Sequence, residues 1–326
     1  MVRILTTGLL VLISGVAATR AQPQQPRVSV DIEELLWWLP PDTETVQVTQ
    51  TPASPRGPLF DGIEHARGEI GGGDESFSDT LTQHLKGRRV KATVDGSRRF
   101  TPPSGLGGML YEGAMIVRFE KPLGETGTRL MADLGKRALK VDHFDGLEIV
   151  EFRDKLESDT WTTYIAIPSA DLLVIATNRA YIEELLRRRK TRTGLRALPE
   201  DLPEWQWVDV TAPYWALRHY RRDAANDPTS PFARRNVVNG FDNAALGVTA
   251  HVNSDGRTIV AHYLSQAGTA EQIARRIWNH PGDGVSPAFR RVGSNAIEVR
   301  SVAKDEEDLS MFFFYLMAAL GHATYL

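Results

Sequence analysis

The sequence contains no cysteine among its 326 residues. This absence excludes disulfide bonds, thiolate catalysis, cysteine metal sites and lipid attachment through cysteine. A chain of this length can build a core large enough to remain folded outside the cytoplasm without disulfide bonds. Hydrophobic residues make up 42% of the chain and charged residues 24%. This globular composition excludes collagen-like, coiled-coil and wholly disordered proteins.

Linear motifs for catalysis and metal binding are also lacking. None of the eight histidines falls in an H-E-x-x-H or similar metal spacing, and no G-x-S-x-G elbow occurs. The sequence therefore predicts no cofactor and no metal, and it leaves any catalytic residue unknown. His251 and His262 flank a predicted hairpin turn at Ser254-Asp255-Gly256, where they can face each other. Two ordinary strand histidines are the simpler interpretation of this pair.

Long apolar runs are scarce, and the first one lies at the N-terminus. Arg3 precedes an apolar segment from Ile4 to Val16, and Ala21 supplies a small residue before a polar tail that opens at Gln22. This pattern is typical of a secretory signal peptide. A membrane anchor is the alternative, but the run is short for a spanning helix. We expect a mature chain that begins near Gln22, has no transmembrane span and is secreted or periplasmic.

Net charge bears on the class of partner. Cleavage after Ala21 removes two of the 38 basic residues, Arg3 and Arg20, and none of the 41 acidic ones, which leaves a net charge of −5. A net acidic protein is a poor candidate for general nucleic-acid binding, so no nucleic acid is expected as a partner.

The order of the expected elements predicts the fold. An alternating strand at Trp161–Ile167 is followed by a turn, an apolar strand at Leu172–Ala176 and a helix that ends at Lys190. A similar order recurs over Arg290–Leu320. We therefore predict an α+β fold of mainly antiparallel sheets with helices packed against them, in two related β-β-α-β-β-α halves. Chance recurrence in an α+β chain is the alternative.

These elements divide the chain into segments. We expect a signal peptide at 1–21, a flexible spacer at 22–30, an N-terminal half at 31–190 with a long Pro/Gly-rich loop at about 50–73, a connector at 191–240 and a C-terminal half at 241–326. A helix from Asp31 has Ile32, Leu35, Leu36 and Leu39 on one face. Asp95-Gly96 is expected to form a turn. Within the connector we expect a strand at Gln206–Val210 and a short helix at Tyr214–Tyr220.

The last helix, expected from Asp305 to Leu320, is apolar nearly all round after an acidic start. This pattern predicts a deeply buried core helix. Membrane insertion is the alternative, although the apolar run is too short to span a bilayer.

The connector holds two candidate contact surfaces. Its aromatic residues are a candidate surface for a sugar or a partner protein: Trp205, Trp207, Tyr214 and Trp215. The alternative is that these rings fix the connector onto the domains it joins. A basic band from Arg187 to Arg235 holds eleven Lys or Arg against six acidic residues. Its first cluster is a candidate surface for an anionic partner: Arg187, Arg188, Arg189, Lys190 and Arg192. A solvated face with helix capping is the alternative.

The sequence thus favours a non-enzymatic binding or scaffold protein of the cell envelope, whose partner is an anionic envelope component or another protein. The alternative is a cofactor-free hydrolase that acts on an envelope polymer, because catalytic groups need not form a linear motif. Converging polar groups in a pocket would favour the hydrolase, and an exposed aromatic or basic surface would favour binding.

Overall fold

The computed structural model describes most of the chain between residues 28 and 304. The described residues are 28–50, 80–81, 83–100, 110–156, 159–191, 194–219, 245–265, 287–304 and, singly, 271, 274, 275, 278 and 308. The predicted signal peptide, the predicted loop at about 50–73 and nearly all of the predicted C-terminal helix lie outside these residues.

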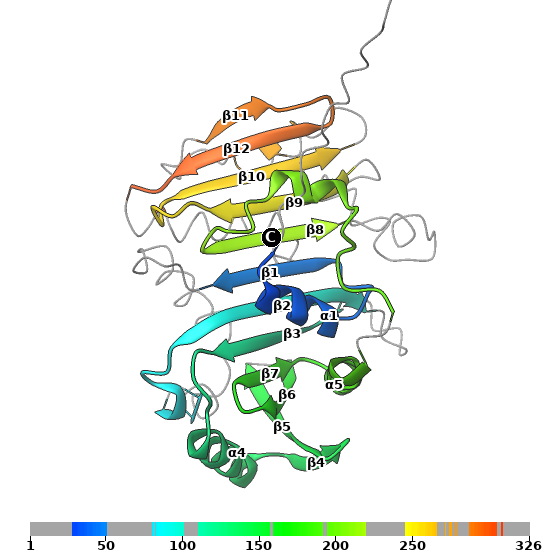
Figure 1. Cartoon of the computed structure of the whole chain (residues 1–326), viewed down its shortest axis with the longest axis vertical. Helices are drawn as coiled ribbons and strands as arrows, with labels where there is room; N and C mark the ends of the chain where they lie inside the picture. The colour runs from blue at the N-terminus through cyan, green and yellow to red at the C-terminus, as the bar shows by residue number, and fades with distance from the viewer. Residues whose placement is uncertain are drawn as a thin grey trace, which may run out of the picture.

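The described strands form one sheet of twelve, in which all neighbours are antiparallel (Figure 1). The strands are β1 (Thr45–Gln50), β2 (Val90–Phe100), β3 (Leu110–Phe119), β4 (Lys140–Phe144), β5 (Leu147–Leu156), β6 (Asp159–Ser169), β7 (Leu172–Ala176), β8 (Tyr214–His219), β9 (Ala245–Val252), β10 (Thr258–Ser265), β11 (Ala288–Arg291) and β12 (Ala296–Val302). The helices are α1 (Val30–Trp38), α4 (Glu125–Arg137), α5 (Arg179–Thr191) and the short 3-10 helix η1 (Pro203–Trp207). The prediction of an α+β fold with a large antiparallel sheet is confirmed.

Strands β1 and β8 pair at the centre of the sheet, although about 170 residues separate them in sequence. On one side of this pair the order is β1-β2-β3-β7-β6, followed by β5 and β4. On the other side the order is β8-β9-β10-β12-β11. In each group, therefore, the third strand from the centre pairs with the strand that comes last in the sequence: β3 pairs with β7, and β10 pairs with β12.

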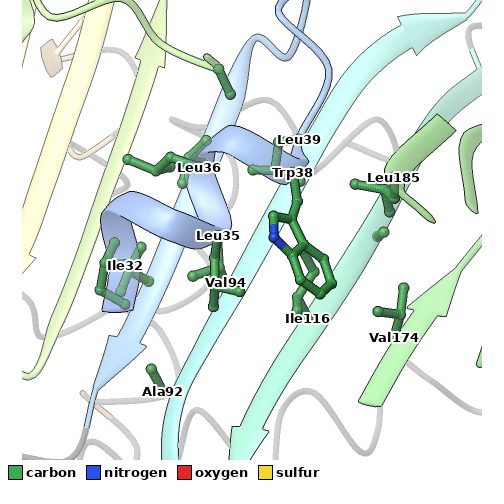
Figure 2. Close-up of a cluster of buried hydrophobic side chains, with 14 of the residues drawn as sticks. Ile32, Leu35, Leu36, Trp38, Leu39, Ala92, Val94, Ile116, Val174 and Leu185 are labelled. Atoms are coloured by element: carbon green, nitrogen blue, oxygen red, sulfur yellow. The ribbon is translucent and has the colours of Figure 1, made fainter. Parts of the chain in front are cut away.

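Helix α1 covers the middle of one face of the sheet. The hydroxyl of Ser29 caps its first turn by accepting a hydrogen bond from the backbone N–H of Ile32, at 3.4 Å. The four residues predicted to share a face, from Ile32 to Leu39, are all at most 1% exposed. Their side chains pack against Val94 and Ile116 of the underlying strands (Figure 2). The sequence prediction of this helix is confirmed.

Helix α5 and the segment 194–212 cover further parts of the same face, next to α1. The opposite face has a separate core, in which Leu130 and Leu134 of α4 meet Phe119, Phe152 and other apolar residues of the sheet. No helix in the described part of the chain is both long and apolar enough to cross a membrane.

Three local predictions are wrong. Asp95 and Gly96 lie inside β2 rather than in a turn. Glycine at position 96 allows the close packing of the end of α1, because a Cβ there would lie 2.5 Å from Leu39. The helix predicted at 214–220 is the central strand β8 over its described residues, and the strand predicted at 206–210 is replaced by η1. Burial on both faces of the sheet overrides the local helical pattern in β8.

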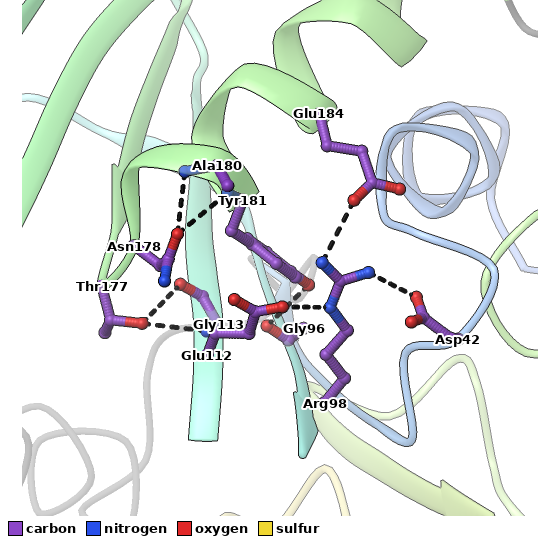
Figure 3. A network of polar contacts seen from close by, with 10 residues as sticks. All are labelled: Asp42, Gly96, Arg98, Glu112, Gly113, Thr177, Asn178, Ala180, Tyr181 and Glu184. Carbon is purple, nitrogen blue, oxygen red and sulfur yellow. Dashed lines mark hydrogen bonds and ion pairs between the residues drawn. The ribbon is translucent and has the colours of Figure 1, made fainter. Parts of the chain in front are cut away.

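Two arginines on the sheet hold the helices in place. Arg98 of β2 contacts Asp42 at 2.7 Å, Glu112 of β3 at 2.5 Å and Glu184 of α5 at 3.2 Å (Figure 3). Burial lowers the pKa of Arg98, but hydrogen bonds to Asp42 and Glu112 outweigh burial and raise it above its ordinary value. Arg118 of β3 contacts Asp31 and Glu34 of α1, each at 2.9 Å.

Substitution in α1 tests the packing of this face. Leu35→Ala should lower the free energy of unfolding by about 2–5 kcal/mol, because it leaves a cavity between α1 and the sheet. Val30→Ala, in the same helix at a residue 87% exposed, should change it by less than about 0.5 kcal/mol. Urea denaturation of both variants is the measurement. Equal stability of the two variants would contradict this packing.

Candidate functional site

The basic residues at the end of α5 mostly make contacts within the protein. Arg188 donates a hydrogen bond to the carbonyl of Leu195 at 2.6 Å, and Arg189 donates one to the carbonyl of Pro168. Lys190 pairs with Asp145 in the β4–β5 turn. These contacts attach the last turn of α5 to neighbouring loops.

The remaining members of the basic band contribute little to a described surface. Arg187 is exposed and lies over the ring of Phe144, at 5.4 Å from the ring centroid. Arg192 and the second basic cluster, from residue 221 to 235, lie outside the described residues. In the described part of the band, Arg187 and Lys190 are exposed, and Lys190 is paired with Asp145.

The predicted aromatic surface does not exist as one surface. Trp205 is 3% exposed, and Tyr214 and Trp215 are fully buried. Successive residues of a strand point to opposite faces, so Tyr214 and Trp215 of β8 cannot share a surface. The indole of Trp205 packs edge-on against that of Trp215, at 5.9 Å, and donates a hydrogen bond to the carbonyl of Pro199. Three of the four rings therefore fix the connector onto the sheet.

Trp207 is the member of the aromatic group that keeps an exposed part. Its ring lies over the ring of His262 in β10, with the two ring centroids 5.3 Å apart. His251 of β9 lies on the same face of the sheet, and its ring centroid is 6.5 Å from that of His262. The register pairs His251 with Val260 and His262 with Thr249, so the two histidines are diagonal neighbours.

Hydrogen bonds connect these rings to the chain after η1. The backbone N–H of Asp209 donates to Nδ1 of His251 at 3.4 Å. The hydroxyl of Thr249 donates to the carbonyl of Trp207 at 3.3 Å and lies 3.5 Å from Nδ1 of His262. We call these residues, together with Glu298 of β12, the Trp207 cluster: Trp207, Asp209, Thr249, His251, His262 and Glu298.

Burial dominates the electrostatics of the Trp207 cluster. Desolvation lowers the pKa of His262 to about 4, although Glu298 lies 3.4 Å from Nε2 and opposes the shift. Desolvation also lowers the pKa of His251, against the opposing charge of Asp209. Burial raises the pKa of Glu298, but the hydrogen bonds and charges of Arg290 and His262 together outweigh burial and lower it. Both histidines are therefore neutral at pH 7, beside ionised carboxylates.

Beyond the Trp207 cluster, the same face of the sheet is exposed over β12 and β11. Arg290, whose side chain is 69% exposed, pairs with Glu298 across the two strands at 2.8 Å. Arg300 is also exposed, and Val302 is 56% exposed. Among the described elements, the covering layer on this face ends at η1 (Figure 1).

A second group of polar residues lies under η1. The carboxylate of Glu204, which is fully buried, contacts Nδ1 of His219 at 2.8 Å. Its other oxygen, Oε2, has no hydrogen-bond partner among the described residues. Glu204 rests directly on Gly247 of β9, where a Cβ would lie 2.2 Å from Oε1. This glycine is therefore required for the close approach of η1 to the sheet.

Within the described residues, no group of three or more His, Asp or Glu side chains is arranged to hold a metal ion. A signal for part of the candidate site is present in the sequence, because His251 and His262 flank the turn of a predicted hairpin. The sequence holds none for Asp209, Glu298, Glu204 or His219, which come together only through long-range strand pairing.

The contact between Glu204 and Gly247 generates a prediction. Gly247→Ala should lower the free energy of unfolding by about 1–3 kcal/mol, because the added methyl also lies 2.7 Å from the carbonyl of Arg218. Gly293→Ala should change the free energy of unfolding by less than about 1 kcal/mol, because a Cβ at this position has no described neighbour within 4 Å. Thermal denaturation compares the two variants. An unchanged stability for Gly247→Ala would mean that η1 does not rest on β9.

Comparison with known proteins gives no family for this chain. No protein-family profile matches the sequence, and no curated protein matches it. Solved structures with a related arrangement include crystal forms I and III of TP0453, with 9% and 10% sequence identity. The TM-score is 0.47 in both cases, and the superposed regions cover 86% and 84% of this chain and 96% and 95% of the other.

Proposed function

We propose that the protein is a non-enzymatic binding or scaffold protein of the cell envelope. One observation carries the proposal: the exposed sheet face formed by β12 and β11, bordered by the partly exposed Trp207. This sheet face has an indole and two exposed arginines, which are residue types enriched in protein interfaces, beside an exposed valine. We call this surface the Trp207 face: Trp207, Arg290, Glu298, Arg300 and Val302.

The charge of the Trp207 face favours a protein partner over an anionic polymer. Arg290 is already paired with Glu298, and Asp209 adds a further negative charge next to Trp207. The mixed signs disfavour a surface that attracts polyanions over a distance, which requires an excess of one sign. The anionic envelope component predicted from the basic band is thus the less favoured partner.

The hydrolase alternative rests on the pair Glu204 and His219. A buried carboxylate that orients a partly exposed imidazole is the arrangement of a base and its orienting group. A hydrolase also needs groups that stabilise the developing oxyanion. Among the contacts of His219 with the described residues there is neither a nucleophile nor an oxyanion donor, so we favour binding as the function.

The same strand orders on the two sides of the β1·β8 pair support a further proposal, that the chain consists of two related halves. In this proposal β1-β2-β3-β7-β6 corresponds to β8-β9-β10-β12-β11, and the hairpin β4–β5 is an addition to the first half. The second half would then begin within the predicted connector, near η1. The exposed Trp207 face would correspond to the part of the first half that α1 and α5 cover.

Location outside the cytoplasm is an expected property of this function. Mass analysis of the N-terminus, on protein isolated from its native host, should give Gln22 as the first residue. The reason is the charged start, the apolar run and the small residue at the cleavage site. Recovery of the bulk of the protein with Met1 intact would contradict a cleaved signal peptide.

Binding to envelope material tests the Trp207 face directly. Purified mature protein should co-sediment with an envelope fraction, and Trp207→Ala should weaken this binding by about tenfold or more, as the loss of a central interface tryptophan does. The matched control is Trp37→Ala, because Trp37 is a partly exposed tryptophan on α1 and is not part of the Trp207 face.

The outcomes separate the candidate functions. Equal loss of binding in both variants, or no loss in either, would overturn the role of the Trp207 face. Binding that falls steeply as salt rises would favour an anionic polymer instead of a protein. Release of soluble fragments from the envelope fraction, abolished by His219→Gln, would favour the hydrolase.

A further inference from the structure

In the segment from Trp207 to Asp209, the outer two residues contact two histidines and Val208 between them is buried in the main core, while the flanks of the segment are attached elsewhere. On the N-terminal side, Trp205 packs against Trp215 and is bonded to the carbonyl of Pro199. On the C-terminal side, the amide of Gln50 donates to the carbonyls of Val210 and Ala212, each at 2.8 Å. Local opening of residues 207–209 therefore does not require either flank to detach.

The contacts in the middle of this segment need neutral histidines. His251 accepts the Asp209 N–H at Nδ1, and an imidazolium carries a proton on that nitrogen and cannot accept. His262 is 6% exposed and lies beneath the indole of Trp207, so its cation would lose most of its hydration. Protonation of either ring thus opposes the closed arrangement.

The charges that face these rings act in both directions. Asp209 and Glu298 favour the cations, and Arg290 and Arg300 on β11 and β12 oppose them. The lowered pKa values of both histidines indicate that burial and the arginines prevail. Glu204 contacts His219 of β8 and neither histidine of the Trp207 cluster, so it does not enter this balance.

We propose that residues 207–209 form an acid-operated clamp, which rests on β9 and β10 while His251 and His262 are neutral and lifts when they take up protons. The clamp regulates the surface of the proposed function, because lifting it moves Trp207 away from Arg290 and Arg300. Regulation of the Trp207 face is the one part of this inference that rests on the proposed function; the clamp itself does not. At acidic pH the partner of the Trp207 face is released.

The sign of the pH dependence follows from the lowered pKa values. An opened clamp exposes the histidines to water, where their pKa is about 6.5, so the open form binds more protons than the closed form. The equilibrium constant for opening should be flat above pH 7 and should rise as the pH falls below 6.5. For His262 alone, with a closed-state pKa of about 4, the rise is about tenfold at pH 5.5 and about 80-fold at pH 4.5.

Amide hydrogen exchange at residues 206–210 measures this constant without any partner. After correction for the intrinsic pH dependence of exchange, we expect opening to increase as stated between pH 7.5 and 4.5. The amides of β1, β2 and β3 should stay protected over the same range. His251→Asn with His262→Gln should remove the pH dependence, because neither amide side chain titrates. His143→Gln, at an exposed position on β4, should leave the response unchanged.

Three results would overturn the clamp. These are unchanged exchange at residues 206–210 down to pH 4.5, an equal response in the double variant, and parallel opening of the central strands, which would mean global unfolding. The clamp and the proposed function fail separately. A pH response with full envelope binding by Trp207→Ala would leave the clamp and reject the Trp207 face as the binding surface. Loss of binding in that variant without a pH response would do the reverse.

Discussion

The antiparallel pairing of β1 with β8 is the constraint on which the rest of the structure depends. It joins seven strands on one side to five on the other, and it brings together residues that are about 170 positions apart. Trp215 and Val48 meet on one face of this pair, and the hydroxyl of Tyr214 donates to Gln47 on the other. Without this pairing the described strands would form two smaller sheets, one with β1 and the other with β8 as an open edge strand.

Two internal ionic clusters connect the strands of the sheet to the helices. Arg98 and Arg118 arise from adjacent strands, and each reaches carboxylates of the helical layer. A buried guanidinium left without its carboxylate is costly, so these contacts fix where α1 and α5 lie more strictly than apolar packing alone. The segment 194–212 is held to α1 in the same way, because Arg196 contacts Glu33 at 2.6 Å. The covering layer therefore extends from α5 through α1 to η1 and places Trp207 at its border.

Local patterns in the sequence were sufficient for the elements that depend on local chemistry. The helix from Asp31 and the hairpin at Ser254-Asp255-Gly256 both have a cap or a turn residue that identifies them. Strand β8 was missed because its side chains are apolar on both faces, and apolar residues at 214, 215 and 217 fit a helix equally well. The four aromatic residues do not form one surface, because strand geometry directs the neighbouring rings of Tyr214 and Trp215 to opposite faces of the sheet.

The candidate site was recognisable in sequence only as two histidines near a turn, and its chemistry comes from the layer that ends above it. Where η1 covers the sheet, His262 is buried and neutral. Two strands further, on β11, the side chain of Arg290 is exposed on the same face. A titratable ring at such a boundary gains more hydration from a small displacement of the cover than a ring deep in the core or one already exposed. In the function and the clamp proposed above, the position of the last covering element would determine both where the sheet contacts a partner and which residues make that contact sensitive to pH.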